Sequence, residues 1–195
     1  MGAELGALGY RVTGVDSSRS MLERARRRLG PQAALAECRL PDLPVDGPFD
    51  AAISTFDGLN YLTPEEFRAT LVVVAGRLRP GGWLVFDLHT DATMHFVAGH
   101  PTVEGEAEGH RYVISNAVDT RARACDSSIL VTRLADGDTF REDHRQYFFS
   151  DEQVRGSLRQ AGFDTVSVTD EYTDRPTDAT TLRATWTGRI PPVPA

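Results

Sequence analysis

Short apolar runs recur through the first 90 residues and end each time in polar side chains. The runs at 10–15, 49–55 and 83–89 are rich in Val, Ile, Leu and Phe. Continuous apolar runs of this length are typical of buried parallel strands. A fourth run at 33–38 predicts a weaker strand. We therefore predict a parallel sheet built from these segments.

Helical patterns lie before and between these strands. Apolar positions at helical spacing predict helices at 1–8, 21–29 and 67–78. Ser17 or Ser18 can cap the second helix, and Gly30-Pro31 can stop it. Thr63 and Glu66 form a capping-box pattern before the third. Strand–helix alternation of this kind predicts an α/β fold with helices on both faces of the sheet.

The pattern changes after residue 90. An irregular segment, 90–109, precedes three strand-like runs without helices, at 110–118, 126–134 and 139–149. The Ala-Asp-Gly-Asp sequence at 135–138 is a hairpin signal, so we predict a small antiparallel sheet.

A capped helix follows at 154–161, and two final runs at 163–170 and 182–188 have no helix between them. These two runs must pair antiparallel or lie in different places. The tail at 190–195 is expected to fray. The length of 195 residues fits a single domain, 1–195, with the antiparallel sheet inserted at 102–149.

Charge and cysteine usage narrow the class of protein. The net charge of −7 argues against a nucleic-acid partner, and no apolar stretch is long enough to cross a membrane. Cys38 and Cys125 match no metal or redox spacing, which favours reduced thiols in a cytoplasmic protein. The spacing of His89, His95 and His100 fits no zinc pattern, so no metal is expected.

Asp16 is the first candidate for a binding role. It follows a predicted strand directly and precedes a predicted helix. Open α/β sheets bind ligands at the carboxyl ends of their strands, where an acidic side chain accepts hydrogen bonds from ribose hydroxyls. Asp is also a common turn residue, so the fragment alone leaves both readings open.

Several motifs occur together in an order that resembles one family. They are Gly9-Tyr-Arg-Val-Thr-Gly-Val-Asp16, Phe49-Asp50, Phe56-Asp-Gly-Leu-Asn-Tyr-Leu62, Leu78-Arg-Pro-Gly-Gly-Trp-Leu-Val-Phe-Asp87 and Gln160-Ala-Gly-Phe163. Their order and spacing are similar to those of class I S-adenosylmethionine-dependent methyltransferases, over nearly the whole chain. The antiparallel insertion resembles the lid of methyltransferases that act on small molecules.

The resemblance implies a Rossmann-like sheet, S-adenosylmethionine as cofactor and a small-molecule methyl acceptor. It assigns the cofactor ribose to Asp16 and the adenine side to Ser17, Met21 and Leu40. Phe56 and Asp57 would border the methionine end of the cofactor.

The acceptor side follows from the same resemblance. Asn60 and Tyr61 would border the substrate entrance. Methyl transfer needs a base only if the acceptor keeps its proton. His89, His144 and Tyr147 are candidate bases, although each also fits an ordinary polar position at a strand end or in a sheet.

The sequence departs from the family at two points. The first strand and its Gly-rich turn, expected immediately before Met1, are not found, and Gly2 and Gly6 fall in the helix that should follow. We therefore expect a truncated methyltransferase sheet that lacks its first strand and, as written, binds the cofactor poorly. At the adenine contact, Arg39 replaces the usual acidic residue and offers no acceptor.

Two other functions stay open at this point. A nicotinamide-dependent oxidoreductase also uses a strand-end acidic residue for ribose, but the sequence contains no G-x-G-x-x-G. A non-catalytic remnant, or a binding subunit completed by another chain, is the third alternative.

Overall fold

The computed structural model describes residues 1–30 and 33–193. The predicted helix stop at Pro31 and the end of the tail, 194–195, lie outside these residues. The elements are α1 (Gly2–Ala7), β1 (Thr13–Asp16), α2 (Arg19–Leu29), β2 (Ala34–Glu37), β3 (Phe49–Ser54), η1 (Gly58–Tyr61), α3 (Pro64–Ala75), β4 (Leu78–His89), α4 (Asp91–Gly99), β5 (Thr102–Ala107), β6 (His110–Asp119), β7 (Ala124–Arg133), β8 (Thr139–Tyr147), α5 (Asp151–Gln160), β9 (Thr165–Asp170) and β10 (Arg183–Arg189).

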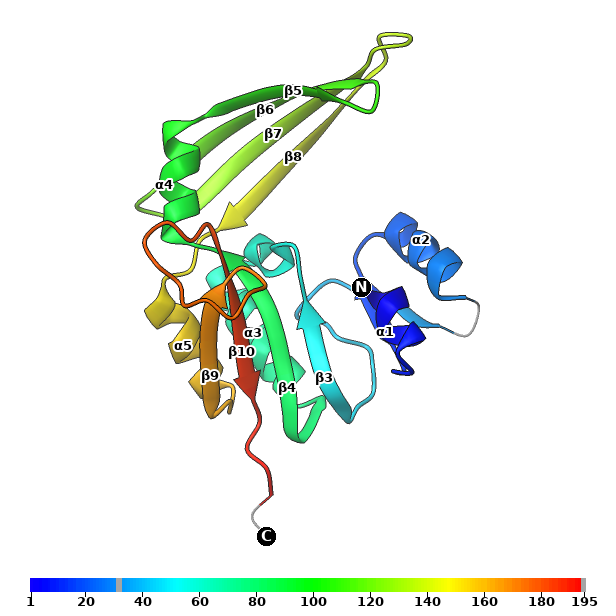
Figure 1. The fold of residues 1–195 in the computed structure, drawn as a ribbon, viewed down its shortest axis with the longest axis vertical. Helices are drawn as coiled ribbons and strands as arrows, with labels where there is room; N and C mark the ends of the chain where they lie inside the picture. Colours follow the sequence, from blue (N-terminus) through cyan, green and yellow to red (C-terminus); the bar gives the residue numbers. More distant parts are fainter. Residues whose placement is uncertain (31–32, 194–195) are drawn as a thin grey trace.

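The described residues form three separate sheets (Figure 1). β1 and β2 make a parallel pair. The main sheet has the order β3-β4-β10-β9, with β3 parallel to β4 and β10 antiparallel to both of its neighbours. The strands β5 to β8 form an antiparallel sheet, here called the lid sheet, which extends beyond one end of the main sheet. The antiparallel pairing of the last two strands is confirmed.

Local sequence signals explain most of the helix boundaries. Thr63 and Glu66 form the predicted capping box at the start of α3, with Pro64 at the first helical position. Ser150 and Gln153 do the same for α5. Ser18, rather than Ser17, caps α2 by accepting a hydrogen bond from the Met21 N–H. These helices begin where predicted because their caps satisfy otherwise unpaired backbone N–H groups.

The core belongs to the main sheet and to α3 and α5. Phe67 stacks on Phe149 with ring centroids 4.4 Å apart and meets the edge of Phe86 at 6.1 Å. Phe86 in turn stacks on Trp186 of β10. Leu158 of α5 belongs to the same buried cluster. This packing fixes the strand ends that carry the polar side chains described below.

Two strands predicted to be buried are not. No residue of β1 or β3 is buried, and Val15 and Ile53 are 36% and 45% exposed. Within residues 1–30 and 33–193, β1 pairs only with β2, and β3 pairs only with β4. The prediction of burial is wrong for both strands because their remaining edges carry no strand in the described chain.

Three predicted boundaries are also wrong. The strand expected at 10–15 starts only at Thr13. The helix expected to reach Leu78 ends at Ala75. The strand expected to begin at 83 begins at Leu78, because Leu78 already pairs with Phe49, ahead of a shift in the register between β3 and β4.

The segment 90–109, expected to be irregular, contains α4 and β5. Thr90 caps α4 by accepting a hydrogen bond from the Thr93 N–H, and β5 completes the lid sheet by pairing with β6. Glu104 and Glu106 weaken the apolar alternation that would have indicated the strand.

Candidate functional site

Four elements meet at one end of the main sheet. β3 and β4 are parallel, so the loop 55–57 and η1, which follow β3, lie beside His89 at the end of β4. Arg183, at the start of antiparallel β10, is the register partner of His89. The end of β8 contacts η1 from the lid sheet. Figure 1 shows the lid sheet beyond this end of the main sheet.

A buried ion pair lies at the centre of this end. Asp87 is 1% exposed and Oδ2 lies 3.1 Å from Nε of Arg183. The same guanidinium donates from Nη2 to Oδ1 of Asp57 at 3.1 Å, and its Nη1 is 3.8 Å from Glu171. The Arg183 guanidinium therefore lies within ion-pair distance of three carboxylates. Buried charges need such partners.

The backbone before η1 is strained and held in place. Phe56 and Asp57 both have left-handed φ values, 60° and 52°, which non-glycine residues rarely adopt. The Phe56 N–H donates to the Tyr172 hydroxyl at 3.3 Å, and the Asp57 N–H donates to Oδ2 of Asp87 at 3.1 Å. Tyr172 itself donates to Oδ2 of Asp87 at 3.0 Å. Strain of this kind gathers at functional sites.

Asn60 connects the lid sheet to the main sheet. Its side chain is fully buried, its Nδ2 donates to the Tyr147 carbonyl at 2.7 Å, and its Oδ1 accepts from the His89 N–H at 3.0 Å. Both ends of the amide are therefore bonded to backbone. Asn60 fixes the position of His89 relative to the end of β8.

The surroundings of His89 favour the neutral form of its ring. Its Nε2 lies 3.9 Å from Oδ1 of Asp57, and its ring stacks on Phe148 with centroids 6.4 Å apart. Burial lowers the pKa of His89 below its usual value, and the Arg183 charge lowers it further, while the Asp57 and Asp87 carboxylates oppose this. A neutral imidazole can accept a proton.

The other candidate bases lie on β8. The His144 ring meets the edge of Tyr61 with centroids 5.7 Å apart, and its Nε2 is 3.3 Å from Glu142. Burial raises the pKa of Tyr61, and the Asp57 and Glu142 carboxylates add to this effect. Tyr147 packs against the main core with the Arg145 guanidinium over its ring at 5.6 Å.

The residues predicted for the adenosine part of the cofactor lie in or near β1, α2 and β2, outside the strands of the main sheet. Asp16 is exposed at the end of β1, and its Oδ1 accepts from the Ser18 N–H at 2.7 Å. Ser17 and Arg39 are exposed, Met21 is 48% exposed, and Leu40 packs against the main core. Within the described residues, no hydrogen bond or ion pair joins Asp16, Ser17 or Met21 to the loop at 55–61.

Four residues of this network were missed in the sequence: Asp87, Gln146, Tyr172 and Arg183. Asp87 carried a signal, because a charged residue stands inside the apolar run at 83–89. Gln146, Tyr172 and Arg183 reach the site only through tertiary packing. Gln146 donates from Nε2 to Oδ2 of Asp57 at 2.6 Å.

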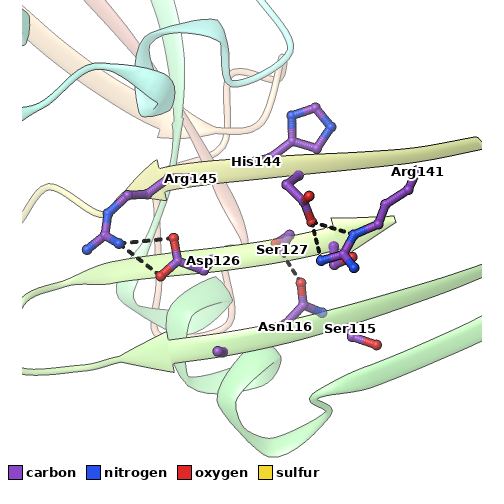
Figure 2. A pocket seen from close by; sticks show the side chains of 10 residues that line it. Ser115, Asn116, Asp126, Ser127, Arg141, His144 and Arg145 are labelled. Carbon is purple, nitrogen blue, oxygen red and sulfur yellow. Dashed lines mark hydrogen bonds and ion pairs between the residues drawn. The ribbon is translucent and has the colours of Figure 1, made fainter. Parts of the chain in front are cut away.

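A shallow hollow lies on the lid sheet, apart from this network (Figure 2). Arg145 of β8 pairs with Asp126 of β7, as Figure 2 shows, and Arg141 pairs with Asp143 on the same strand. These charges satisfy one another. The pairs share the face opposite to Gln146, because successive side chains on β8 alternate between faces.

The described residues hold neither a metal-binding cluster nor a membrane-spanning helix. Residues 1–30 and 33–193 contain no group of three or more His, Cys, Asp or Glu side chains placed to hold a metal ion. None of the helices described is long and apolar enough to span a membrane.

Comparison with known proteins identifies the family. A family profile described as "Methyltransferase domain" matches residues 1–82. The chain is 31% identical over 172 residues to the putative methyltransferase YqeM of Bacillus subtilis (strain 168), covering 85% of this chain and 70% of that protein.

Two solved structures share the fold. An S-adenosylmethionine-dependent methyltransferase from Clostridium acetobutylicum superposes with a TM-score of 0.86 at 21% identity, over 96% of this chain and 78% of that one. CalS10, an amino pentose methyltransferase from Micromonospora echinaspora, gives 0.66 at 19% identity, over 96% and 79%. The oxidoreductase alternative gains no support from these relatives. The chain belongs to the class I S-adenosylmethionine-dependent methyltransferases.

Proposed function

We propose that this chain transfers a methyl group from S-adenosylmethionine to a small molecule held between the main sheet and the lid sheet. The observation that carries the proposal is the place of His89, a half-buried imidazole at the end of β4, beside the contact between η1 and β8. The small-molecule class is supported by relatives such as the amino pentose methyltransferase. A lid sheet inserted at 102–149 in a single domain is part of this proposal.

The exposed side chains around β1 fit the cofactor. Asp16 offers a carboxylate at a strand end, and within the described residues only its Oδ1 is engaged. Large apolar side chains at Met21 and Phe56 are 48% and 69% exposed, as expected of surfaces that an adenosine or a methionine chain would cover. When bound, S-adenosylmethionine supplies a methyl group activated by its sulfonium charge.

Each residue of the cofactor side has one proposed role. Asp16 accepts hydrogen bonds from the ribose hydroxyls. Ser17 and Met21 line the adenine side, together with Arg39 and Leu40. Phe56 and Asp57 border the methionine end, where the backbone is fixed by the Tyr172 and Asp87 bonds.

The acceptor side positions its ligand and removes a proton. His89 accepts the acceptor's proton at Nε2, because burial lowers the pKa of His89 and so favours the neutral ring that can take up a proton. Asn60 holds His89 and the end of β8 in register. Tyr61 borders the acceptor from η1, and His144 and Tyr147 on β8 are the alternative bases. Holding donor and acceptor in line supplies most of the acceleration.

A second candidate, a chain that binds but does not catalyse by itself, is favoured by one observation. Within residues 1–30 and 33–193, the β1–β2 pair shares no strand pairing with β3. The adenosine end of the cofactor would then be held beside the β1–β2 pair and its methionine end beside the main sheet, and no strand pairing joins the two in the described residues. The two free cysteines, Cys38 and Cys125, support a reducing, cytoplasmic setting for either candidate.

Methyl transfer from labelled S-adenosylmethionine to a pool of small metabolites tests the proposal. We expect labelled product from the wild-type chain, a loss of about 100-fold in His89→Gln if His89 is the base, and weaker cofactor binding in Asp16→Ala. Saturable cofactor binding without any labelled product would favour the binding subunit. Absence of both binding and product would contradict the proposed function.

A further inference from the structure

One carboxylate joins the lid sheet to the main sheet. Asp57 accepts from Nε2 of Gln146, on β8, at 2.6 Å through Oδ2. Through Oδ1 it accepts from Nη2 of Arg183, on β10, at 3.1 Å. Asp57 itself lies in the loop between β3 and η1. Its two oxygens therefore bind one donor from each sheet.

The backbone of Asp57 is held by groups other than its side chain. Its N–H donates to the buried Asp87, and the preceding N–H, that of Phe56, donates to Tyr172. Both residues keep left-handed φ values, which persist only where surrounding bonds enforce them. The backbone that carries the Asp57 carboxylate is therefore fixed independently of Gln146, and the position of Gln146 depends on its bond to Asp57.

Donors and acceptors are clearly divided at this contact. Gln146 and Arg183 approach Asp57 with N–H groups, so both carboxylate oxygens act as acceptors. The side chain is 17% exposed, which shields these bonds from competing water. Hydrogen bonds to a partly buried carboxylate are among the stronger ones in proteins.

The contact also lies next to the candidate base. Nε2 of His89 is 3.9 Å from Oδ1 of Asp57, the oxygen bonded to Arg183. On β8, Gln146 and His144 share a face, because they are two residues apart. Movement of Gln146 would therefore carry His144 with it and change its position relative to His89.

We propose that Asp57 is a positioning residue that clasps β8 of the lid sheet to the main sheet and so sets the geometry of the space beside His89. The assignment of that space to a methyl acceptor rests on the proposed function. The clasp between Asp57 and Gln146 does not depend on the proposed function, because its hydrogen bonds are made within the chain.

Exchanging the polarity of the two partners tests the clasp. Gln146→Glu turns a carboxylate toward the Asp57 carboxylate, so this single variant opposes two acceptors. Asp57→Asn alone is milder, because Gln146 can turn its amide over and accept from the new N–H. The double variant restores one donor and one acceptor with the same atoms in place. We expect amide hydrogen exchange at residues 144–147 to be about tenfold faster in Gln146→Glu, less affected in Asp57→Asn and close to wild type in the double variant.

The pKa of His89 provides a second readout, because a general loss of structure would not shift it in opposite directions in the two single variants. Asp57→Asn removes the carboxylate that most raises the pKa of His89, so its ring should titrate at lower pH. Gln146→Glu adds a carboxylate nearby, so the ring should titrate at higher pH. Both are measured by NMR of the ring proton. Shifts of the same sign would contradict the clasp.

Asp126→Asn is the matched control. It makes the same chemical change at an ion pair with Arg145 that links β7 to β8 outside the network. We expect exchange at residues 144–147 to stay at the wild-type rate. Equal acceleration in the control, or a double variant as fast as its faster single variant, would overturn the proposal. None of these measurements needs cofactor or acceptor, so a failed methyl-transfer assay would leave them unaffected.

Discussion

The β1–β2 unit and the main sheet differ in how they are held. No described residue before Leu59 is buried, so α1, β1, α2, β2 and β3 contribute nothing to the fully buried core. The buried cluster instead comes from later elements, chiefly α3, β4, α5 and β10. Both regions carry apolar patterns that predict burial, but among the described residues only the later one buries apolar side chains fully.

This difference separates the two halves of the candidate site. The acceptor half, with His89 and Asp57, rests on a densely bonded core. The cofactor half, with Asp16 and Met21, rests on a two-stranded sheet whose side chains stay partly in water. Exposed elements open with little free energy, whereas core strands open only on global unfolding. We therefore expect the acceptor half to keep its geometry under conditions that loosen the cofactor half.

Removing an apolar side chain from each half should give the largest contrast. Phe67→Ala leaves a cavity between Phe86 and Phe149 and should cost about 3–5 kcal/mol of unfolding free energy. Val15→Ala, on β1, should cost no more than about 0.5 kcal/mol. Urea unfolding followed by the fluorescence of the buried Trp186 measures both. Equal losses in the two variants would break the comparison.

Removing a charge should give the next largest effect. Asp87→Ala leaves Arg183 without its buried partner and the Tyr172 hydroxyl without its acceptor, which should cost about 3 kcal/mol. Asp50→Ala is the control, because Asp50 forms an exposed ion pair with Arg79 and exposed pairs contribute little. The same urea unfolding assay applies. A control loss as large as that of Asp87→Ala would contradict the assignment of Asp87 as the buried centre.

Helix caps offer a matched pair of smaller changes. Thr63→Ala removes the capping box of α3, which packs in the core, and should cost about 1 kcal/mol. Ser18→Ala removes the cap of α2, which has no buried residue. The unfolding free energy measured through Trp186 fluorescence should hardly change in Ser18→Ala. A full cap effect at Ser18 would mean that α2 unfolds together with the core.

The pH dependence of stability should show the smallest effect. The pKa of His89 in the folded chain is below its usual 6.5, so the unfolded chain binds the proton more tightly. Stability therefore falls as the pH drops below 6.5, until the folded chain is protonated too. His89→Gln should reduce this slope of unfolding free energy against pH. An unchanged slope would show that His89 is not responsible.

The elements were largely predictable from the sequence because their signals are local. Thr63, Ser150 and the Asp-Gly hairpin at 136–137 act through neighbouring residues, and their elements form where expected. The exposure of β1 and β3 was not predictable, since burial depends on which strand lies beside them. The clasp was not predictable either: Gln146 and Arg183 are 89 and 126 positions from Asp57. His89 could be predicted because it ends a strand, and Asp57 only through the resemblance of the segment 56–62 to the methyltransferase family.

A titration with S-adenosylmethionine, followed by amide NMR of the whole chain, tests the central claim most directly. We expect the signals of Asp16, Ser17 and Met21 to shift together with those of Phe56 and Asp57, and all of them to follow one saturation curve. Asp16→Ala should weaken that curve about tenfold at both groups, since each lost hydrogen bond to a charged group contributes about 1.5 kcal/mol or more. Shifts confined to one group, or two unrelated curves, would contradict a single cofactor held by both halves.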